Sequence, residues 1–378
     1  MVSATTSQTQ LIYIAESQWG ETPPSPTMQM LRLTGESLSY DKQTEISAEI
    51  TADRSRRDMI ETAVSASGEV NFELSYGDYD TLIAAALFNT YDQESISGAS
   101  LDFAGATIIG PGGGTFDNLF LGQWVKISGA VAANNGIYKI SDILGETLTL
   151  AGASFATQTT AAAVIDGKRL INGATRSSFS IEKQFLDVSQ YALFSGLVPG
   201  GFTLNVAAGQ IVTGAVSFTG KVGGISGSTT AASVTAATEN TSFVGGISVG
   251  DVEEGGATLT TALQSISLSA ANSLREQVSI SSKFPTDITA GSFDVTGSIT
   301  AYFENAALYQ KFINHQATSL SFRLTDAADN VIVVTLPRVY FTSGNPIAEG
   351  ADQDILLPLD FTAVKDPVTG AVLQIDML

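Results

Sequence analysis

The sequence changes from strand periodicity to helix periodicity in two places, and this repeated pattern restricts the possible folds more than any other feature. In SGEVNFELSYGDYDTLIAAALF, residues 67–88, apolar side chains first alternate and then recur at helical spacing. TGSITAYFENAALYQKFI, residues 296–313, repeats this change, and Gly68 aligns with Gly297 at an offset of 229 without a gap. Each half of the chain is therefore predicted to contain a strand that runs directly into a short helix.

Three further matches occur in the same order, which favours a tandem duplication over the generic alternation of a β-rich chain. One of these matches aligns only with gaps, and the other two have offsets of 141 and 143. Because the offset falls from 229 to 141, the first copy carries about 88 extra residues after its helix. The matches pair SLSYDKQTEISAEI at 37–50 with SISLSAANSLREQVSI at 265–280, SSFSIE at 177–182 with TSLSFR at 318–323, and VSFTGK at 216–221 with LDFTAV at 359–364.

These offsets divide the chain into two mainly β domains, an insertion and two irregular segments. TPPSPT at 22–27 favours an extended arm, and the Gly-, Ser- and Thr-rich run at 223–256 favours a connector with strands near Phe243 and Val249. The predicted segments are an N-terminal extended arm at 1–30, domain A at 31–91 and 171–222, an inserted small β domain at 92–170, a connector at 223–259, and domain B at 260–378.

The insertion has strand patterns of its own. QWVKI at 123–127, GIYKI at 136–140 and TLTL at 147–150 are predicted strands, and the NNG sequence at 134–136 favours a turn between the first two. Because the insertion interrupts domain A without abolishing the pattern on either side, we expect it to project from a surface of domain A.

The charge balance argues against binding of nucleic acid through its phosphates. The 378 residues include 18 basic and 38 acidic side chains, a net charge of −20, whereas phosphate binding needs a surplus of Lys and Arg. With 44% hydrophobic and 15% charged residues, the chain can bury large cores and is mainly β in character. It has no cysteine, no apparent signal peptide and no uninterrupted apolar run, so we expect a soluble protein made in the cytoplasm with no membrane partner.

No motif for catalysis or for a cofactor is recognisable. The only histidine, His315, has no triad pattern around it. The glycine-rich runs at 108–117 and 220–227 lack the Walker lysine and the helix that would complete a nucleotide site. We therefore expect a turn and a connector at these two places, and no enzyme activity or cofactor.

Pairs of acidic residues occur three times, but none extends into a calcium loop with its terminal Glu. We expect helix caps from Asp78 or Asp80 and from Asn305, and a hairpin turn at DAADN, 326–330. No metal site is predicted. The pairs are Asp78 with Asp80, Asp326 with Asp329, and Asp352 with Asp354.

DRSRRDMIE at 53–61 is the densest cluster of charge, and in it Arg54, Arg56 and Arg57 lie beside Asp58. Charge runs are usually solvated loops. Alternatively, three arginines on a chain of charge −20 complement an acidic copy of the same chain, so the loop would be an inter-subunit contact. The sequence leaves both interpretations open, and the second predicts that this loop and the connector are mobile before assembly and ordered after it.

Six segments carry a family resemblance, which covers both halves of the chain but not the insertion. They are SLSYDKQTEISAEITADRSRRD at 37–58, VNFELSYGDYDTLIAAAL at 70–87, SFSIEKQF at 178–185, GQIVTGAVSFTGK at 209–221, VTGSITAYFENAALYQKF at 295–312, and LPRVYFTSG at 336–344. In these segments the chain resembles the tail tube, or major tail, proteins of siphophages, which are long-tailed bacteriophages.

The resemblance implies a β-sandwich or barrel-like domain with a flanking short helix, whose sheets join edge to edge between subunits. The resulting rings stack into a hollow tube through which phage DNA passes during ejection, and the duplication implies trimeric, pseudo-hexameric rings. An acidic lumen would repel DNA rather than bind it. The lumen candidates are Glu69 and Glu73 on one strand and Glu45 and Glu49 on another, although either sheet face could be exterior. The insertion is expected on the tube exterior.

The resemblance also implies a place in the virion tail, with the tail tip or initiator, tape measure and tail terminator proteins as partners. Two rivals remain. An inner tube protein of a contractile tail would share the fold but need a sheath, which an outward insertion would obstruct. A surface β-sandwich adhesin would fit the composition but normally needs an export signal. Electron microscopy of concentrated protein separates tubes from monomers that bind glycans or cells.

Overall fold

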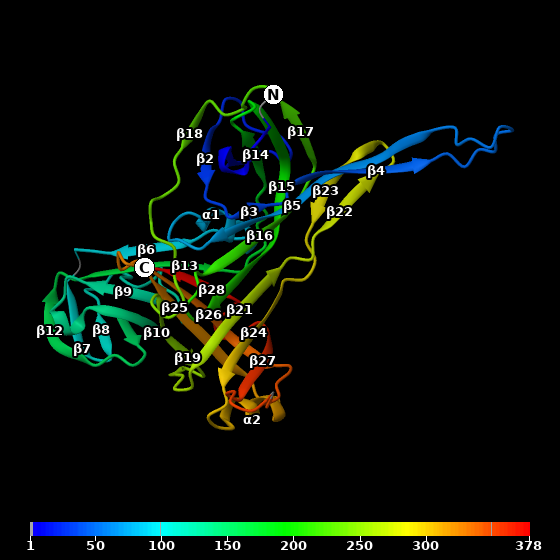
Figure 1. Cartoon of the computed structure of the whole chain (residues 1–378). Coiled ribbons are helices and arrows are strands. Elements are labelled where there is room, and N and C mark those ends of the chain that lie inside the picture. Colours follow the sequence, from blue (N-terminus) through cyan, green and yellow to red (C-terminus); the bar gives the residue numbers. More distant parts are fainter. Residues whose placement is uncertain (1–2, 99, 349) are drawn as a thin grey trace.

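The computed structural model describes residues 3–98, 100–348 and 350–378 and confirms a mainly β fold (Figure 1). The two predicted changes from strand to helix are also confirmed, because β5 (Met59–Glu73) precedes α1 (Asp80–Ala86) and β24 (Asp294–Tyr302) precedes α2 (Ala307–Ile313). No helix in the described part of the chain is long and apolar enough to cross a membrane.

We call the strands on both sides of the insertion unit A and the C-terminal half unit B. The insertion consists of β6–β13. Unit A contains β1 (Thr9–Ala15), β2 (Thr27–Leu31), β3 (Gly35–Glu36), β4 (Ser39–Ile46), β5, α1, β14 (Phe179–Phe185), β15 (Gln190–Ala207), β16 (Thr213–Gly220), β17 (Val222–Ser226) and β18 (Ser233–Thr235). The insertion contains β6 (Asp92–Ile96), β7 (Leu101–Gly105), β8 (Thr107–Ile109), β9 (Trp124–Ser128), β10 (Gly136–Leu144), β11 (Thr147–Leu150), β12 (Phe155–Ala161) and β13 (Val164–Ile171). Unit B contains β19 (Val249–Glu254), β20 (Ala257–Thr258), β21 (Leu263–Ala271), β22 (Arg275–Ser279), β23 (Ser282–Thr289), β24, α2, β25 (Thr318–Thr325), β26 (Val331–Phe341), β27 (Leu356–Ala363) and β28 (Gln374–Met377).

One antiparallel sheet, which we call the inner sheet, runs through both units in the order β4–β5–β16–β15–β21–β24–β27. The long strand β15 makes this possible because its register shifts between Pro199 and Gly201. Its first part pairs with β14 and β17 in a second layer, and its last part pairs with β16 and β21 in the inner sheet. Gly201 is required at the bend, since a Cβ there would lie 2.0 Å from the Ala270 carbonyl oxygen.

The ladders confirm the aligned positions of the two halves. Gly68 of β5 is paired with Phe218 of β16, and Gly297 of β24 is paired with Phe361 of β27. The two glycines were aligned at an offset of 229 and the two phenylalanines at an offset of 143. Two sequence matches that were found separately therefore meet as cross-strand partners in each unit.

The start of each unit differs from the predicted division. The segment expected to be a free N-terminal arm contains β1, which pairs with β14 and places Tyr13 opposite Ile181. The connector contains β19, which confirms the strand predicted near Val249, and β19 pairs with β25 and places Val252 opposite Phe322. Ile181 and Phe322 are themselves aligned, so β1 and β19 occupy equivalent places. The two strands are short and share no evident sequence similarity, which hid the equivalence.

A single apolar core lies between the inner sheet and the strands and helix that cover it. In unit A, α1 buries Leu82 and Ile83, and Tyr79 stacks on Phe72 with ring centroids 4.1 Å apart. In unit B, α2 has only Leu308 fully buried and lies at one end of the unit (Figure 1). The amphipathic pattern thus placed both helices correctly, but only α1 covers the core extensively.

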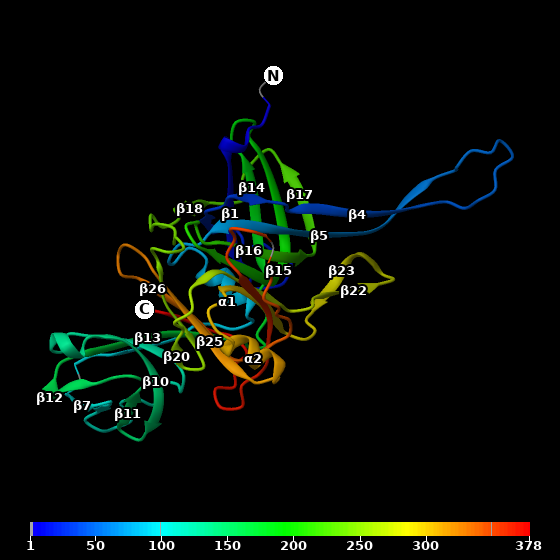
Figure 2. The ribbon, with the colours of Figure 1, turned by 60° about the horizontal axis from the view of Figure 1, so that its bottom comes forward.

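The insertion has its own core and forms a separate lobe on the opposite side of the body from the projecting β4–β5 hairpin (Figure 2). Its predicted strands are confirmed as β9, β10 and β11. Its last strand, β13, also pairs with the C-terminal strand β28, which places Arg169 opposite Asp376. The insertion therefore contacts unit B as well as the unit A sequence that it interrupts.

Candidate functional site: a polar sheet face, two hairpins and two sheet edges

The inner sheet has one apolar face, which packs into the core, and one polar face. The polar face follows from strict alternation, since cross-strand partners point to the same side. Two rows of partners cross both units: Glu73, Thr213, Asn205, Ser267, Ser298 and Asp360, and next to it Asn71, Ala215, Thr203, Ser269, Thr296 and Thr362. The six strand segments that supply this face, 67–73, 201–207, 213–219, 265–271, 294–300 and 358–362, contain no Lys or Arg.

This polar face is concave where the two units meet. A hollow of about 550 Å³ lies over β15, β21, β24 and β27, and hydroxyl and amide side chains such as Thr203, Asn205 and Ser267 line it. Asp360 is the acidic residue at its border. The surface thus offers hydroxyl groups and carboxylates but no cation to hold a phosphate.

The four acidic lumen candidates do not share one surface. Glu69 and Glu73 lie on the polar face, opposite Ser217 and Thr213. Glu45 lies opposite Ile60 near the outer end of β4, and Glu49 lies in the loop beyond β4, so both belong to the projecting β4–β5 hairpin and not to the two rows above. The unpaired residue at the register shift is Thr62 of β5, so β4 itself alternates without interruption and Glu45 keeps the side of Asp41 and Gln43. The sequence could not show that this end of β4 extends beyond the body.

A long hairpin, formed by β4, the loop at 47–58 and the first half of β5, projects far from the body (Figure 1). It carries all four inter-subunit candidates. Arg57 makes an ion pair with Glu49 across the loop, Arg54 adopts a φ of +66°, and Asp58 accepts a hydrogen bond from the Met59 amide. Arg54 and Arg56 make no ion pair within the described residues.

A second, shorter hairpin of β22 and β23 projects beside the long one (Figure 2). Glu61 connects the two, because its carboxylate lies 3.2 Å from the Lys42 ammonium on β4 and 2.5 Å from that of Lys283 on β23. Hydrogen bonds from Lys283 and then Lys42 lower the pKa of Glu61. This link could not be predicted from the sequence, because no local pattern indicates that two residues 222 positions apart are in contact.

The tips of both hairpins expose large apolar side chains. They are Ile46, Ile50, Met59 and Ile60 on the long hairpin and Val278 and Ile280 on the short one. An isolated soluble chain rarely gathers exposed apolar groups at the ends of projecting hairpins, so these tips are candidates for contact with another molecule.

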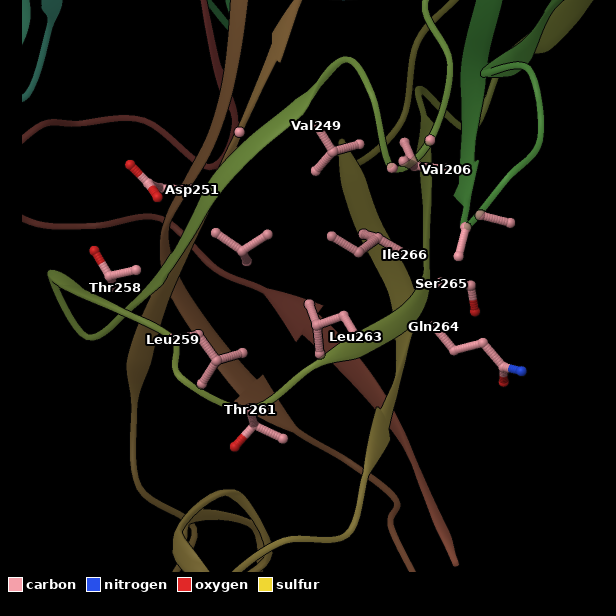
Figure 3. A pocket seen from close by; sticks show the side chains of 16 residues that line it. Val206, Val249, Asp251, Thr258, Leu259, Thr261, Leu263, Gln264, Ser265 and Ile266 are labelled. Atoms are coloured by element: carbon pink, nitrogen blue, oxygen red, sulfur yellow. The ribbon is translucent and has the colours of Figure 1, made fainter. Parts of the chain in front are cut away.

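A pocket of about 290 Å³ lies where β15 of unit A meets β19–β21 of unit B. Figure 3 shows Val206, Val249, Leu263 and Ile266 around it, with Asp251 and Thr258 toward one side. Its lining mixes apolar side chains with polar ones such as Asp251, Thr258 and Gln264. We interpret it as a gap at one end of the joint between the two units.

A buried polar network, which we call the seam, joins the insertion to unit B. The Arg169 Nε donates to Gln374 Oε1 at 3.1 Å, and Gln374 Nε2 donates to the Gly122 carbonyl at 2.8 Å and to Asp376 Oδ2 at 2.7 Å. Trp124 Nε1 donates to Thr335 Oγ1 at 3.2 Å. Burial raises the pKa of Asp376 to about 7. No sequence pattern indicated the seam, because its members lie in four distant segments.

The remaining motifs have structural roles. His315 stacks on Tyr340 with ring centroids 4.7 Å apart, and no group of three or more potential metal ligands occurs in the described residues. In the glycine-rich loop at 108–117, Gly114 and Thr115 donate their N–H groups to the Glu146 carboxylate, so these two amides already bind an anion within the chain. This agrees with the turn predicted there.

Neither helix has the predicted side-chain cap, because the cap residues are Tyr79 for α1 and Ala306 for α2. Asn305, one residue before the cap of α2, accepts a hydrogen bond from the Ala307 amide at 2.9 Å. Asp78 does not cap α1; it makes a 3.1 Å ion pair with Arg32 and accepts from Ser75. Asp326 organises the predicted turn at 326–330 through the amides of Ala328 and Asn330.

A family model described as phage tail tube protein matches residues 6–363, which span both units and the insertion. No curated protein matches the chain.

Proposed function

This chain belongs to the phage tail tube protein family, and we propose that it polymerises as stacked rings into the hollow tube through which phage DNA passes during ejection. Membership makes it a structural component of the virion tail that assembles with itself and associates with other tail proteins. The family is not a family of enzymes. Ring formation, the lining of the channel and the contacts between chains are our proposals.

The polar face of the inner sheet is the proposed lining of the lumen, and this observation carries the proposal. The face is concave, continues across both units and has no Lys or Arg in its six strand segments. Binding to DNA depends on cations that neutralise phosphates, so such a surface lets DNA slide without holding it. Glu69, Glu73 and Asp360 add repulsion. Glu45 and Glu49 are not among the proposed lining residues, because they lie on the projecting β4–β5 hairpin.

Three chains would make one ring. Each chain contributes two equivalent units joined by continuous strand pairing, so three chains present six units around the axis. Unit A contributes four inner strands, and unit B contributes β21, β24, β27 and the end of β26, which pairs with β27. A ring of three chains then has about twenty-four strands, and a spacing of about 4.8 Å gives a circumference of about 115 Å and a backbone diameter of about 37 Å. Strand tilt would widen it further. A channel of this size can admit a DNA double helix.

The two hairpins are the proposed contacts between successive rings. They project together from one side of the body, they are tied to each other through Glu61, and their tips are apolar. Arg54 and Arg56 near the tip of the long hairpin would meet acidic groups of another copy, as the charge of −20 suggests. We further propose that the loop at 47–58 becomes ordered when this contact forms.

The insertion is the proposed exterior of the tube. It lies on the opposite side of the body from the long hairpin, has a separate core, and would not fit in a channel that carries DNA (Figure 2). The tail tip or initiator, the tape measure protein and the tail terminator remain the proposed partners, and the host cytoplasm remains the proposed place of synthesis.

Electron microscopy of the concentrated purified protein tests the proposal. We expect stacked rings or tubes with a central channel. Protein that stays monomeric at all concentrations, and binds glycans or cells instead, would overturn it. A tube surrounded by a contractile sheath in the virion would identify the inner tube of a contractile tail, the alternative that shares the fold.

A further inference from the structure

We infer that the joint between units A and B within one chain is the template for the joint between neighbouring chains, and that it fixes the register of that contact. This inference rests on the proposed ring. The internal joint is the antiparallel pairing of β15 with β21, in which Thr203 lies opposite Ser269 and Asn205 opposite Ser267. The chain has an unpaired edge at each end of the inner sheet, and these two edges are equivalent to the two sides of the joint.

The first free edge belongs to unit A and corresponds to β21. In unit B, Ser269 is paired with Thr296. In unit A, Ser39 is paired with Ser67, the residue that aligns with Thr296 at the offset of 229. The Ser37 amide donates to the Glu69 carbonyl at 2.9 Å, which makes Ser37 the equivalent of Ser267. Residues 35–41 thus have the place of β21, but no strand in the described chain pairs with their outer side.

The second free edge belongs to unit B and corresponds to the last part of β15. In unit A, Asn205 is paired with Thr213. Thr213 aligns with Leu356 at the offset of 143, and Leu356 forms a bridge with Ile347. Ile347 is therefore equivalent to Asn205, and Asn345 to Thr203. Residues 342–347 follow β27 only loosely and are not a regular strand.

The contact between chains is obtained by pairing the two free edges in the same register as β15 and β21 in the internal joint. Asn345 of one chain lies opposite Ser39 of the next, and Ile347 lies opposite Ser37, with the two segments antiparallel. On the core side the internal joint places Phe202 opposite Ala270. The new joint places Gly344 opposite Tyr40, so the large and small residues exchange sides while the combined volume stays similar.

Two features of the edges fit this contact. Tyr40, which is paired with Ala66 on the core side of the edge, is 42% exposed in the single chain and becomes covered when the edges pair. By alternation from the Ile347 amide, which donates to Leu356, the outward position is Pro346, which has no N–H. The joint between chains therefore lacks one ladder bond, and the proline blunts the edge of a free chain against unwanted pairing.

Disulfide trapping tests the register, because the chain has no cysteine of its own. Two single variants, Asn345→Cys and Ser39→Cys, are each checked for normal tube assembly, then mixed, assembled and oxidised. We expect covalent dimers on a non-reducing gel, with roughly tenfold less from a matched mixture of Asn345→Cys and Gln43→Cys, whose Cα atoms would be too far apart. A chain carrying both Thr203→Cys and Ser269→Cys is the internal control and should be trapped as a monomer.

The outcomes separate this inference from the proposed function. Tubes whose cross-linking is equal in the two mixtures, or stronger with Gln43→Cys, would refute the register and leave the tube intact. Absence of rings or tubes from the unmodified protein would remove both. If a cysteine variant does not assemble, hydrogen exchange of the unmodified protein decides: the Gly344 amide, which points outward by the same alternation, should gain at least about tenfold protection in tubes, and unchanged exchange would refute the inference.

Discussion

Replacing Asp376 with asparagine is expected to remove a large pH dependence from the stability of the seam. Asp376 is fully buried on β28, between β13 and β26. Its Oδ2 accepts a hydrogen bond from Gln374, whereas Oδ1 has no hydrogen-bond partner among the described residues. Burial disfavours the charged form more than the nearby Arg169 favours it, and the pKa of Asp376 rises to about 7.

The sign and size of the effect follow from this pKa. Between the ordinary value of 3.8 and about 7, the unfolded chain has lost the proton of Asp376 while the folded chain keeps it. Stability therefore falls as the pH rises through this window, by about 1.4 kcal/mol per pH unit, and levels off above pH 7. From pH 5 to pH 7 the free energy of unfolding should fall by about 2 kcal/mol more in the natural chain than in the Asp376→Asn variant, because the folded carboxyl is itself half deprotonated at pH 7.

Urea denaturation of the unassembled protein at pH 5, 6, 7 and 8 measures this difference. Trp124 lies in the seam and bonds to Thr335, so its fluorescence reports on the relevant contacts. A Trp19→Phe background removes the only other tryptophan. Titration of the other carboxylates cancels when the two chains are compared. A difference that stays constant from pH 5 to pH 8 would show that the environment of Asp376 has been misjudged.

Three other perturbations address the assembly and the core. The double variant Arg56→Glu, Arg57→Glu should raise the protein concentration needed for tube formation by roughly tenfold at low salt, as measured by sedimentation, because it turns attraction to an acidic copy into repulsion; assembly that is unchanged at every salt concentration would favour a solvated loop. Replacement of residues 97–164 by a short turn should give tubes of smaller outer diameter and unchanged channel in electron micrographs, whereas loss of the channel would place the insertion inside. Phe361→Ala should lower the free energy of unfolding by about 3–5 kcal/mol because its ring is buried in the core, and Thr362→Ala on the polar face should change it far less; equal effects would contradict the assignment of the two faces.

The sequence was sufficient for features that repeat within a short window. Alternation followed by helical spacing located β5 with α1 and β24 with α2, and local alternation with turn residues located β9, β10 and β11. The duplication also predicted which residues of the two units are structurally equivalent. The cross-strand pairs Gly68 with Phe218 and Gly297 with Phe361 agree with this prediction.

Features that depend on distant contacts could not be predicted in this way. β1 is a strand because β14 is available to pair with it, and TQLIYIA alone does not distinguish a paired strand from an arm. The link from Glu61 to Lys283 and the seam around Asp376 each unite segments more than two hundred residues apart. The register shift at Thr62 of β5, and the extension of β4 beyond the body that separates Glu45 from Glu69, are likewise concealed by the alternating pattern.

A reconstruction of the assembled tube by electron cryomicroscopy tests the central claim most directly. The account predicts rings of three chains with six similar units, a channel whose backbone diameter is about 37 Å or somewhat more, and a lining formed by the rows that contain Glu73 and Asp360. A tube with the apolar tips of the hairpins or the insertion facing the channel, or with the polar face of the inner sheet turned outward, would contradict it.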